Sequence, residues 1–471
     1  MSTGTATGML RKGARALVLA AGLGLALGPG NAPAEPREDG AGEGEYSVPI
    51  ETWRMDNGAR VYFVHRPSLP MVSVRATFDA GSARDPEGRH GLSALVARML
   101  DEGVGDLSPD AFAREVDGLG MDFGASSSRD TFSVQVTSLT SEDTEEQALD
   151  LMARALRDPA FPEAALQRER QRQIISIRRD REDPQTEGVK AFFRAVYGDH
   201  PYAHPGKGIP EHLRGIGRED LRDFAERHFV GANATIAVVG DLERKEARQL
   251  LADSLGGLPE GSRPEPLPEV PELDGPRQVF LERDVTQSHV LMGQPAIRRG
   301  GEDYFPLLVG NYSLGGGGFA SRLMGAVREE RGLSYSVFST FRGLQRRGPF
   351  VAGLQTANEN LEKALEVLQG EVTEFIENGP TEEEVGAAQR YLTGSFPLDI
   401  AGNKDIVSNL ATMGFYGLGE NYLERYIPRV RAVDGQAIQA AMGGRLDPAR
   451  MVTVVVGAKR PEGFEELETG Q

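Results

Sequence analysis

The chain has 471 residues, no cysteine and a formal net charge of −18 at pH 7. Without cysteine it forms no disulfide, carries no cysteine-linked lipid anchor and has no thiol nucleophile. Its acidity disfavours nucleic acid and anionic membranes as partners, because both carry negative charge, while its length suffices for two or more domains.

The N-terminus has the pattern of an export signal. Arg11, Lys12 and Arg15 form a basic start, residues 16–27 are apolar, and Ala32-Pro33-Ala34 offers a small-x-small cleavage site. An uncleaved anchor is the alternative, but the run is shorter than the roughly 20 apolar residues that a membrane span needs. No later segment is long and apolar enough to span a membrane. We therefore predict a signal peptide over residues 1–34, a periplasmic location and no stable membrane span.

The first half of the remaining chain alternates strand and helix patterns. Alternation of apolar residues predicts strands at 61–65 and 72–78, which we expect to pair, and further strands at 131–139 and 235–239. Ser108 followed by Pro109 is typical of a helix start. Helical patterns occupy 91–102, 109–118, 145–156, 162–179 and 220–228.

Residues 258–276 are the most proline-rich part of the chain and predict an extended linker. After it the pattern restarts, with strands expected at 279–281, 288–292, 333–341, 349–356 and 452–457, and helices at 305–312, 360–378 and 381–392. A repeat of about 200 residues indicates a duplicated α+β domain rather than a solenoid. We place the N-terminal domain at 35–257, the linker at 258–276 and the C-terminal domain at 277–471.

The stretch 314–335 combines four glycines at 315–318 with a helical pattern and then a strand. We expect Phe319, Leu323, Met324 and Val327 on the apolar face of that helix, and Gly332 at its end. Arg328 then lies near the helix end and Tyr335 in the strand that follows. Taken alone, both have ordinary explanations, since arginine complements the helix dipole and tyrosine is common in strands.

Several segments, in this order and spacing, carry a resemblance to a known family: 57–64, 80–85, 91–92, 197–202, 238–241 and 314–335. With them the chain resembles the pitrilysin/insulinase family of zinc metallopeptidases, and specifically its bacterial short-chain branch, over nearly all of its length after the signal. The resemblance implies two homologous α+β domains, each with an antiparallel-rich sheet flanked by helices, arranged as the family's half clamshell.

An active member of that family carries His-x-x-Glu-His on the helix that follows Gly91-Leu92, where two histidines bind zinc and the glutamate activates water. Here the ligand positions hold Ala94 and Arg98, and Ala97 takes the place of the general base. Methyl groups cannot bind a metal, and a guanidinium repels one. The family's third ligand falls near Ile175 or Ser176. We therefore expect no metal in this chain, and no zinc hydrolysis by the chain alone.

The histidines offer no replacement for that site. His200 and His204 are four residues apart, but Pro201 separates them, so a surface or capping role is the better interpretation. The other five are scattered along the sequence: His65, His90, His212, His228 and His289.

In heterodimeric members, the resemblance implies, the zinc-less subunit supplies an Arg-x6-Tyr pair to the shared chamber, and Arg328 and Tyr335 match that spacing. We expect a non-catalytic subunit of a periplasmic zinc metallopeptidase that binds unfolded peptide beside a partner with an intact His-x-x-Glu-His motif and its zinc. The alternative is a stand-alone peptide-binding or scaffold protein, with no role in proteolysis, that forms homodimers or binds a partner other than a protease.

Overall fold

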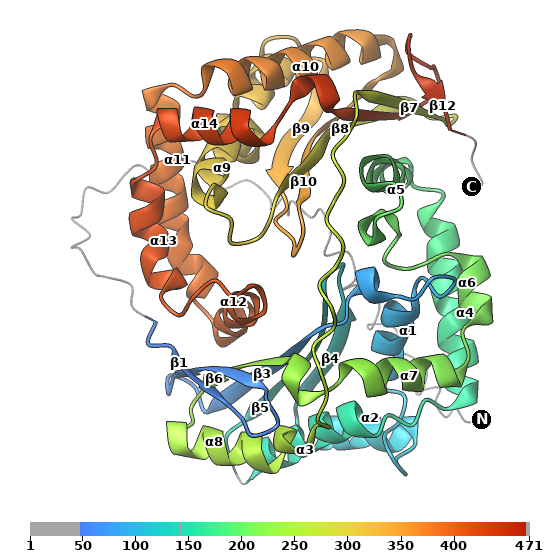
Figure 1. The fold of residues 1–471 in the computed structure, drawn as a ribbon, viewed down its shortest axis with the longest axis vertical. Helices are drawn as coiled ribbons and strands as arrows, with labels where there is room; N and C mark the ends of the chain where they lie inside the picture. Colours follow the sequence, from blue (N-terminus) through green and yellow to red (C-terminus); the bar gives the residue numbers. More distant parts are fainter. Residues whose placement is uncertain (1–47, 142, 468–471) are drawn as a thin grey trace, which may run out of the picture. The chain divides into compact units, whose positions relative to one another are not determined.

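The computed structural model describes residues 48–141 and 143–467, which belong to one unit containing two six-stranded sheets (Figure 1). The predicted signal peptide and the start of the proposed first domain lie outside the described residues. Among the residues that are described, no helix combines the length and the apolar composition required to cross a bilayer.

The N-terminal sheet has the strand order β1-β2-β6-β3-β5-β4. The strands are β1 (Glu51–Arg54), β2 (Arg60–His65), β3 (Met71–Asp79), β4 (Asp122–Ser127), β5 (Thr131–Leu139) and β6 (Ala234–Gly240). The expected pairing of the strands at 61–65 and 72–78 is wrong, because β6 lies between them, parallel to β2 and antiparallel to β3. Every residue of β6 is buried, which is typical of a strand in the middle of a sheet.

The first half of the chain contains eight α-helices among the described residues. They are α1 (Leu92–Met99), α2 (Pro109–Gly118), α3 (Thr144–Arg157), α4 (Glu163–Asp180), α5 (Pro184–Tyr197), α6 (Pro210–Gly215), α7 (Arg218–His228) and α8 (Arg244–Asp253). The predicted cap of α2 is confirmed, since the Ser108 hydroxyl accepts a hydrogen bond from the Ala111 backbone N–H at 3.3 Å. Apolar residues of α2, α3 and α8 pack with Val74 and Phe132 in one core.

The C-terminal sheet repeats the arrangement in the order β12-β7-β11-β8-β10-β9. Its strands are β7 (Arg277–Glu282), β8 (Gln287–Ile297), β9 (Ser334–Phe341), β10 (Gly348–Ala357), β11 (Val452–Gly457) and β12 (Glu465–Glu466), and its helices are α9 (Tyr304–Asn311), α10 (Leu361–Asn378), α11 (Glu382–Ser395), α12 (Asn403–Tyr416), α13 (Tyr422–Arg431) and α14 (Gly435–Arg445). As in the first half, a parallel pair (β7 and β11) is followed by antiparallel neighbours. Two α+β domains with mixed sheets confirm the predicted fold class.

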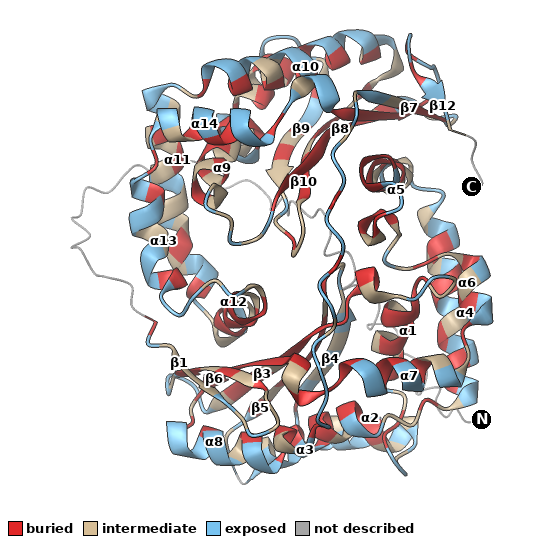
Figure 2. Cartoon of the chain, in the orientation of Figure 1, coloured by how far each residue is buried: buried red, intermediate tan, exposed pale blue. Residues whose placement is uncertain are grey.

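One helix from each half packs on the sheet of the other half. Helix α5 packs on β8 and β11, and α12 packs on β3 and β6 (Figure 1). The approach of α12 is close, because a Cβ at Gly414 would lie 2.4 Å from Thr235 Cγ2. Figure 2 shows buried residues along the strands of both sheets. Neither helix was predicted from the sequence.

Residues 258–276 contain neither helix nor strand and run between the two sheets (Figure 1). The segment is held by ion pairs of Glu269 with Arg298 and Arg346. Near it, the buried carboxylate of Asp130 accepts hydrogen bonds from Tyr202 Oη at 2.7 Å and Tyr416 Oη at 3.0 Å, which links the two halves. The exact limits of domains and linker remain predictions.

Candidate functional site

Helix α1 carries Ala94, Ala97 and Arg98, the three residues that the resemblance assigns to the zinc-motif positions. The helix begins after Gly91, whose φ of +98° suits glycine. Its first turn is capped by Asp85, whose carboxylate accepts hydrogen bonds from the backbone N–H groups of Gly91 at 2.7 Å and Ser93 at 2.8 Å. Burial raises the pKa of Asp85 to about 7, although these two bonds act in the opposite direction. The cap fixes the start of the helix, from which Ala94, Ala97 and Arg98 follow.

Arg98 does not bind a metal but pairs with a buried carboxylate. Its Nη1 atom lies 3.7 Å from Oε2 of Glu169 on α4, whose side chain is only 5 % exposed. Glu169 also pairs with Arg172 Nη1 at 2.6 Å and with Arg168 Nε at 3.3 Å. Because three guanidinium groups surround this carboxylate, a divalent cation beside it would meet strong repulsion.

The residues present do not fit a zinc ion. Ala94 and Ala97 offer only methyl groups, and Arg98 offers a positive charge. Over residues 48–141 and 143–467, no group of three or more histidine, aspartate or glutamate side chains is arranged to hold a metal. We therefore derive no chemical step through zinc in this chain.

The expected location of the third ligand position needs correction. Ile175 is 47 % exposed, and the Ser176 hydroxyl accepts a hydrogen bond from Lys207 at 3.1 Å. The α4 residues that face α1 are instead Glu169 and Gln173, and the Gln173 amide donates to the Gly91 carbonyl at 3.1 Å. The buried positions 166, 169, 173 and 177 recur at helical spacing, a signal that indicated this face in the sequence.

Three histidines that are far apart in sequence meet beside the start of α1. The rings of His90 and His204 stack with centroids 3.6 Å apart, and His212 lies 4.8 Å from His90. Burial lowers the pKa of His90 to about 4, and repulsion from the other two rings adds to this. His90 and His212 are distant in sequence and gave no sign of this contact, but the fold brings them together with His204.

His200 has the predicted capping role. Its Nδ1 accepts the backbone N–H of Tyr202 at 3.1 Å, and its Nε2 lies 3.0 Å from the Pro268 carbonyl oxygen. The ring is 5 % exposed, so the surface alternative is wrong for this residue.

The stretch around Arg328 folds less regularly than the sequence suggested. A π-helical segment at Tyr312–Gly316 and a short 3-10 turn at Gly318–Ala320 precede a second π-helical segment at Met324–Glu329. Leu323, Met324 and Val327 are buried as predicted, but Phe319 is 64 % exposed, which contradicts its expected place on the apolar face. The reason is the glycine run: a Cβ at Gly317 would lie 2.7 Å from the Tyr312 carbonyl oxygen, so the chain folds back there and turns Phe319 outward.

A β-bulge sets the direction of Tyr335. In the pairing of β9 with β10, Ser334 faces Thr356 and Ser336 faces Gln355, so Tyr335 is an extra residue without a partner. The Ser334 hydroxyl lies 2.6 Å from the Gln355 carbonyl oxygen and accepts the Ser336 N–H at 3.1 Å. Bulges redirect side chains at the edges of sheets, and Tyr335 is accordingly 77 % exposed.

Arg328 lies between two aromatic rings. Its guanidinium carbon is 4.4 Å from the ring centroid of Tyr335 and 4.7 Å from that of Phe319. Arg328 forms no ion pair with any carboxylate in the part of the chain that the structure describes. Its N–H donors are thus oriented by the two rings and remain available to a ligand.

Comparison with known proteins identifies the family of this chain. Residues 60–205 match the family described as insulinase (peptidase family M16), and residues 215–392 match the peptidase M16 inactive domain. A solved structure of a peptidase M16 inactive domain from Pseudomonas fluorescens is 35 % identical, covers 88 % of this chain and 100 % of its own, and superposes with a TM-score of 0.83. The chain belongs to the M16 peptidase family.

Similar M16 proteins include both named proteases and a named non-peptidase. The non-peptidase homolog YmxG of Helicobacter pylori is 25 % identical over 413 residues, which are 86 % of this chain and 94 % of that protein. An uncharacterized zinc protease of Mycobacterium leprae is 26 % identical over 361 residues, 76 % of this chain and 80 % of that one. The crystal structure of a protease from Helicobacter pylori, 20 % identical with a TM-score of 0.79 over 86 % of this chain and 99 % of its own, has the same fold.

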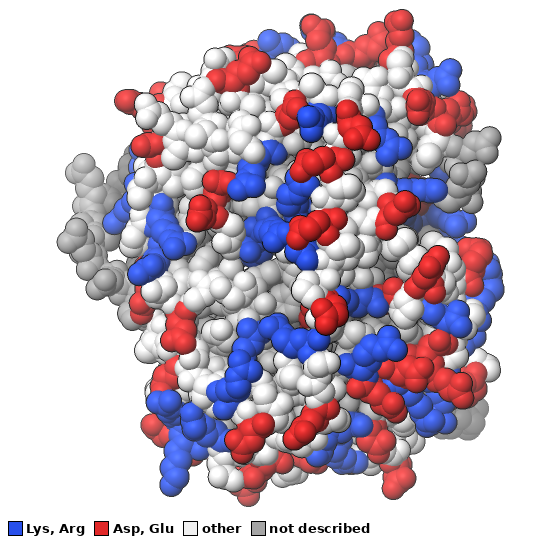
Figure 3. Space-filling view, viewed as in Figure 1, with Lys and Arg blue, Asp and Glu red and all other residues white. Residues whose placement is uncertain are grey.

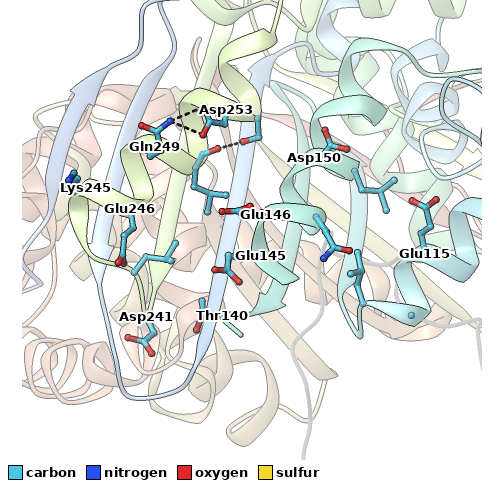
Figure 4. A pocket seen from close by; sticks show the side chains of 17 residues that line it. Glu115, Thr140, Glu145, Glu146, Asp150, Asp241, Lys245, Glu246, Gln249 and Asp253 are labelled. Carbon is cyan, nitrogen blue, oxygen red and sulfur yellow. Dashed lines mark hydrogen bonds between the residues drawn. The ribbon is translucent and has the colours of Figure 1, made fainter. Parts of the chain in front are cut away.

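The M16 chain also has an open depression of about 1440 Å³ on α3, α8 and the end of α2 (Figure 4). Its lining is acidic, with one lysine, Lys245, among Glu115, Glu145, Glu146, Asp150, Asp241, Glu246 and Asp253. Neither Arg98 nor Arg328 lines it. Elsewhere the charges mix: Figure 3 shows Lys and Arg interspersed with Asp and Glu over the face in view.

Proposed function

We propose that this M16 homologue is a non-catalytic subunit of a periplasmic heterodimeric zinc metallopeptidase. It would bind unfolded peptide and supply Arg328 and Tyr335 to the active site of its partner. The observation that carries the proposal is a contrast within one chain. The zinc positions are occupied by methyl groups and by the Arg98–Glu169 ion pair, whereas Arg328 and Tyr335 are in contact, exposed to a ligand and not engaged by a carboxylate.

The chemistry of the pair suits peptide hydrolysis. Attack on a peptide bond builds negative charge on the carbonyl oxygen, and fixed hydrogen-bond donors stabilise that charge. The phenol of Tyr335 and the guanidinium of Arg328 are both donors, and their mutual contact limits the motion of each. In this role they would hold the peptide and stabilise the oxyanion, while the zinc, the activating glutamate and the attacking water belong to the partner.

The proposed partner is an M16 subunit with an intact His-x-x-Glu-His motif. The export pattern of residues 1–34 supports a meeting in the periplasm, and the name of the Helicobacter pylori relative, a non-peptidase homolog, agrees with a helper role.

Co-purification and reconstitution test the proposal. The tagged protein is isolated from periplasm, the proteins bound to it are identified, and cleavage of a quenched fluorescent peptide is measured for each subunit and for the mixture. We expect a zinc-bearing M16 chain among the bound proteins and cleavage only by the mixture. Full activity of the partner alone would refute the proposal.

The exposed aromatic–arginine cluster also suits a second function, in which the chain binds peptides without any role in proteolysis. Phe319, Arg328 and Tyr335 would then contact the peptide in a monomer or homodimer. A monomer or homodimer in sedimentation of the purified protein, together with the absence of a neighbouring gene for an intact M16 subunit, would favour this alternative.

A further inference from the structure

A row of register-paired residues crosses the N-terminal sheet from β6 to β4. Ala237 pairs with Arg75, Arg75 with Gln135, and Gln135 with Gly124. Because paired residues point to the same face, all four lie on the face against which α12 packs. The row therefore runs from beneath α12 toward the edge of the sheet.

The two ends of this row differ in how they are covered. Ala237 is fully buried and belongs to the same apolar cluster as Val407 and Leu410 of α12. Gly124 at the other end is exposed, and a Cβ added there would meet nothing within 4 Å. The space above the β4 end is open, so a ligand can reach the middle of the row from that side.

Arg75 occupies the middle of the row with too few partners. Its Nη1 lies 3.3 Å from the Ser408 hydroxyl of α12, and its buried Nε has no hydrogen-bond partner among the described residues. No carboxylate in residues 48–141 or 143–467 forms an ion pair with it, and burial lowers its pKa. A largely buried cation without a counter-charge is destabilising, so an unpaired group of this kind needs an explanation, and a bound anion provides one.

Gln135 stands directly across from Arg75 and also has spare donors. Its amide makes no hydrogen bond to any described residue, and its side chain is partly exposed. The polar neighbours on the same face are already paired, since the hydroxyls of Ser73 and Thr137 lie 3.0 Å apart. Arg75 and Gln135 are thus left as adjacent donors on a polar surface, with Cβ atoms that cross-strand pairing holds about 5 Å apart.

We propose that Arg75 and Gln135 form a subsite that binds a carboxylate of a bound peptide, either its C-terminus or an acidic side chain. A carboxylate is the matching ligand, because its two oxygens accept from a guanidinium fork and an amide at once and supply the missing negative charge. The inference rests on the proposed peptide binding and adds to it a preference for peptides with a carboxylate at this position.

Calorimetric titration of the full chain tests the subsite with three N-acetylated decapeptides of Ala, Ser and Leu. One has a free C-terminus, one a C-terminal amide, and one an amide and a single internal Glu. We expect at least one carboxylate-bearing peptide to bind about ten- to a hundredfold more tightly than the neutral one, the range for a charged hydrogen-bonded contact. Arg75→Met should abolish this preference, and Gln135→Leu should reduce it. Lys245→Met, which removes the same charge from the acidic depression, should leave it unchanged.

A second readout separates binding from a structural role. If Arg75 were structural, Arg75→Met would lower the Tm; because its charge is uncompensated, we expect the Tm to stay the same or rise. If Arg75→Met does not fold, the preference for carboxylate-bearing peptides is measured with Arg75→Lys and Gln135→Leu instead. Equal binding of all three peptides by the wild type would overturn the subsite and leave the proposed peptide binding intact. Failure to bind any of them would overturn both. The carboxylate-bearing peptide that binds more tightly shows whether the subsite takes a C-terminus or an acidic side chain.

Discussion

The guanidinium carbon of Arg328 lies 4.4 Å from the ring centroid of Tyr335, although the two residues belong to different elements. Arg328 comes from the π-helical segment Met324–Glu329, and Tyr335 comes from the bulge of β9. The ring centroid of Phe319 lies 4.7 Å from the same guanidinium carbon. The cluster positions two hydrogen-bond donors at an exposed point of the C-terminal half. Phe319 and the bulge at Tyr335 should contribute to peptide binding in different ways.

Phe319 should orient Arg328 without stabilising the fold. A cation–π contact at an exposed site contributes about 0.5–1 kcal/mol, so Phe319→Ala should weaken peptide binding roughly two- to fivefold. The Tm should not change, because the ring is 64 % exposed. Calorimetry with a model peptide measures the affinity. Leu398→Ala, which truncates a side chain 72 % exposed in the same half, serves as the control and should have no effect. Equal effects of both variants would contradict an orienting role.

The bulge should depend on the Ser334 hydroxyl. This group is buried and lies within hydrogen-bond distance of the Gln355 carbonyl and the Ser336 N–H. Ser334→Ala leaves buried polar groups unsatisfied, which costs about 1–3 kcal/mol in the free energy of unfolding. Urea denaturation followed by circular dichroism gives this value, and peptide affinity should fall as Tyr335 loses its direction. Ser336→Ala, at the exposed neighbouring position, should be close to neutral in stability.

Zinc should not bind to this chain. The Arg98–Glu169 ion pair and the methyl groups of Ala94 and Ala97 offer no ligand set, so neither added zinc nor EDTA should shift the Tm. Elemental analysis after dialysis against zinc should find no stoichiometric metal. Arg98→Met should also bind none, and should lower the free energy of unfolding by only about 1 kcal/mol because Arg168 and Arg172 still pair with Glu169. A tightly bound zinc in the wild type would contradict the account.

Stability should fall in mild acid because of the histidine cluster. The pKa of His90 is lowered from about 6.5 to about 4, so the unfolded chain binds a proton more readily than the folded one. The contribution of neutral His90 to the free energy of unfolding is fully present above pH 6.5 and is lost as the pH falls through 4. The free energy changes by up to about 1.4 kcal/mol per pH unit in this range. His90→Gln should flatten the pH dependence of urea unfolding. Asp85, with its pKa raised to about 7, acts in the opposite sense, so the difference between variant and wild type is the quantity to compare.

Much of the fold followed from the sequence, because strand alternation, proline placement and helix caps are local signals. The N-cap at Ser108, the left-handed Gly332 and the restart after residue 276 were all readable in this way. The order of strands was not, since β6 enters between β2 and β3 from a position about 170 residues away. Helices α5 and α12 were not predicted, and no local pattern shows that each packs on the sheet of the opposite half.

The choice of Arg328 and Tyr335 as site residues stays a prediction, and the local structure that holds them was not predicted. Spacing placed Arg328 and Tyr335 in the same stretch, yet neither the bulge nor the exposed Phe319 is encoded in a periodic pattern. Both result from backbone irregularity that glycines and a buried serine hydroxyl permit. Arg75 was missed as well, because only the cross-strand register shows which residues leave it without a counter-charge.

The central claim is that Arg328 and Tyr335 act in the active site of another subunit. The direct measurement is kcat for peptide cleavage by the zinc-bearing partner combined with the wild type, with Arg328→Ala or with Tyr335→Phe. Arg331→Ala, an arginine paired with Glu330, and Tyr391→Phe, another exposed tyrosine, are the matched controls. Loss of one oxyanion donor costs roughly 10²- to 10³-fold in kcat, and we expect this for the two site variants with complex formation and the control activities unchanged. Wild-type kcat in complexes that contain Arg328→Ala or Tyr335→Phe would contradict the account.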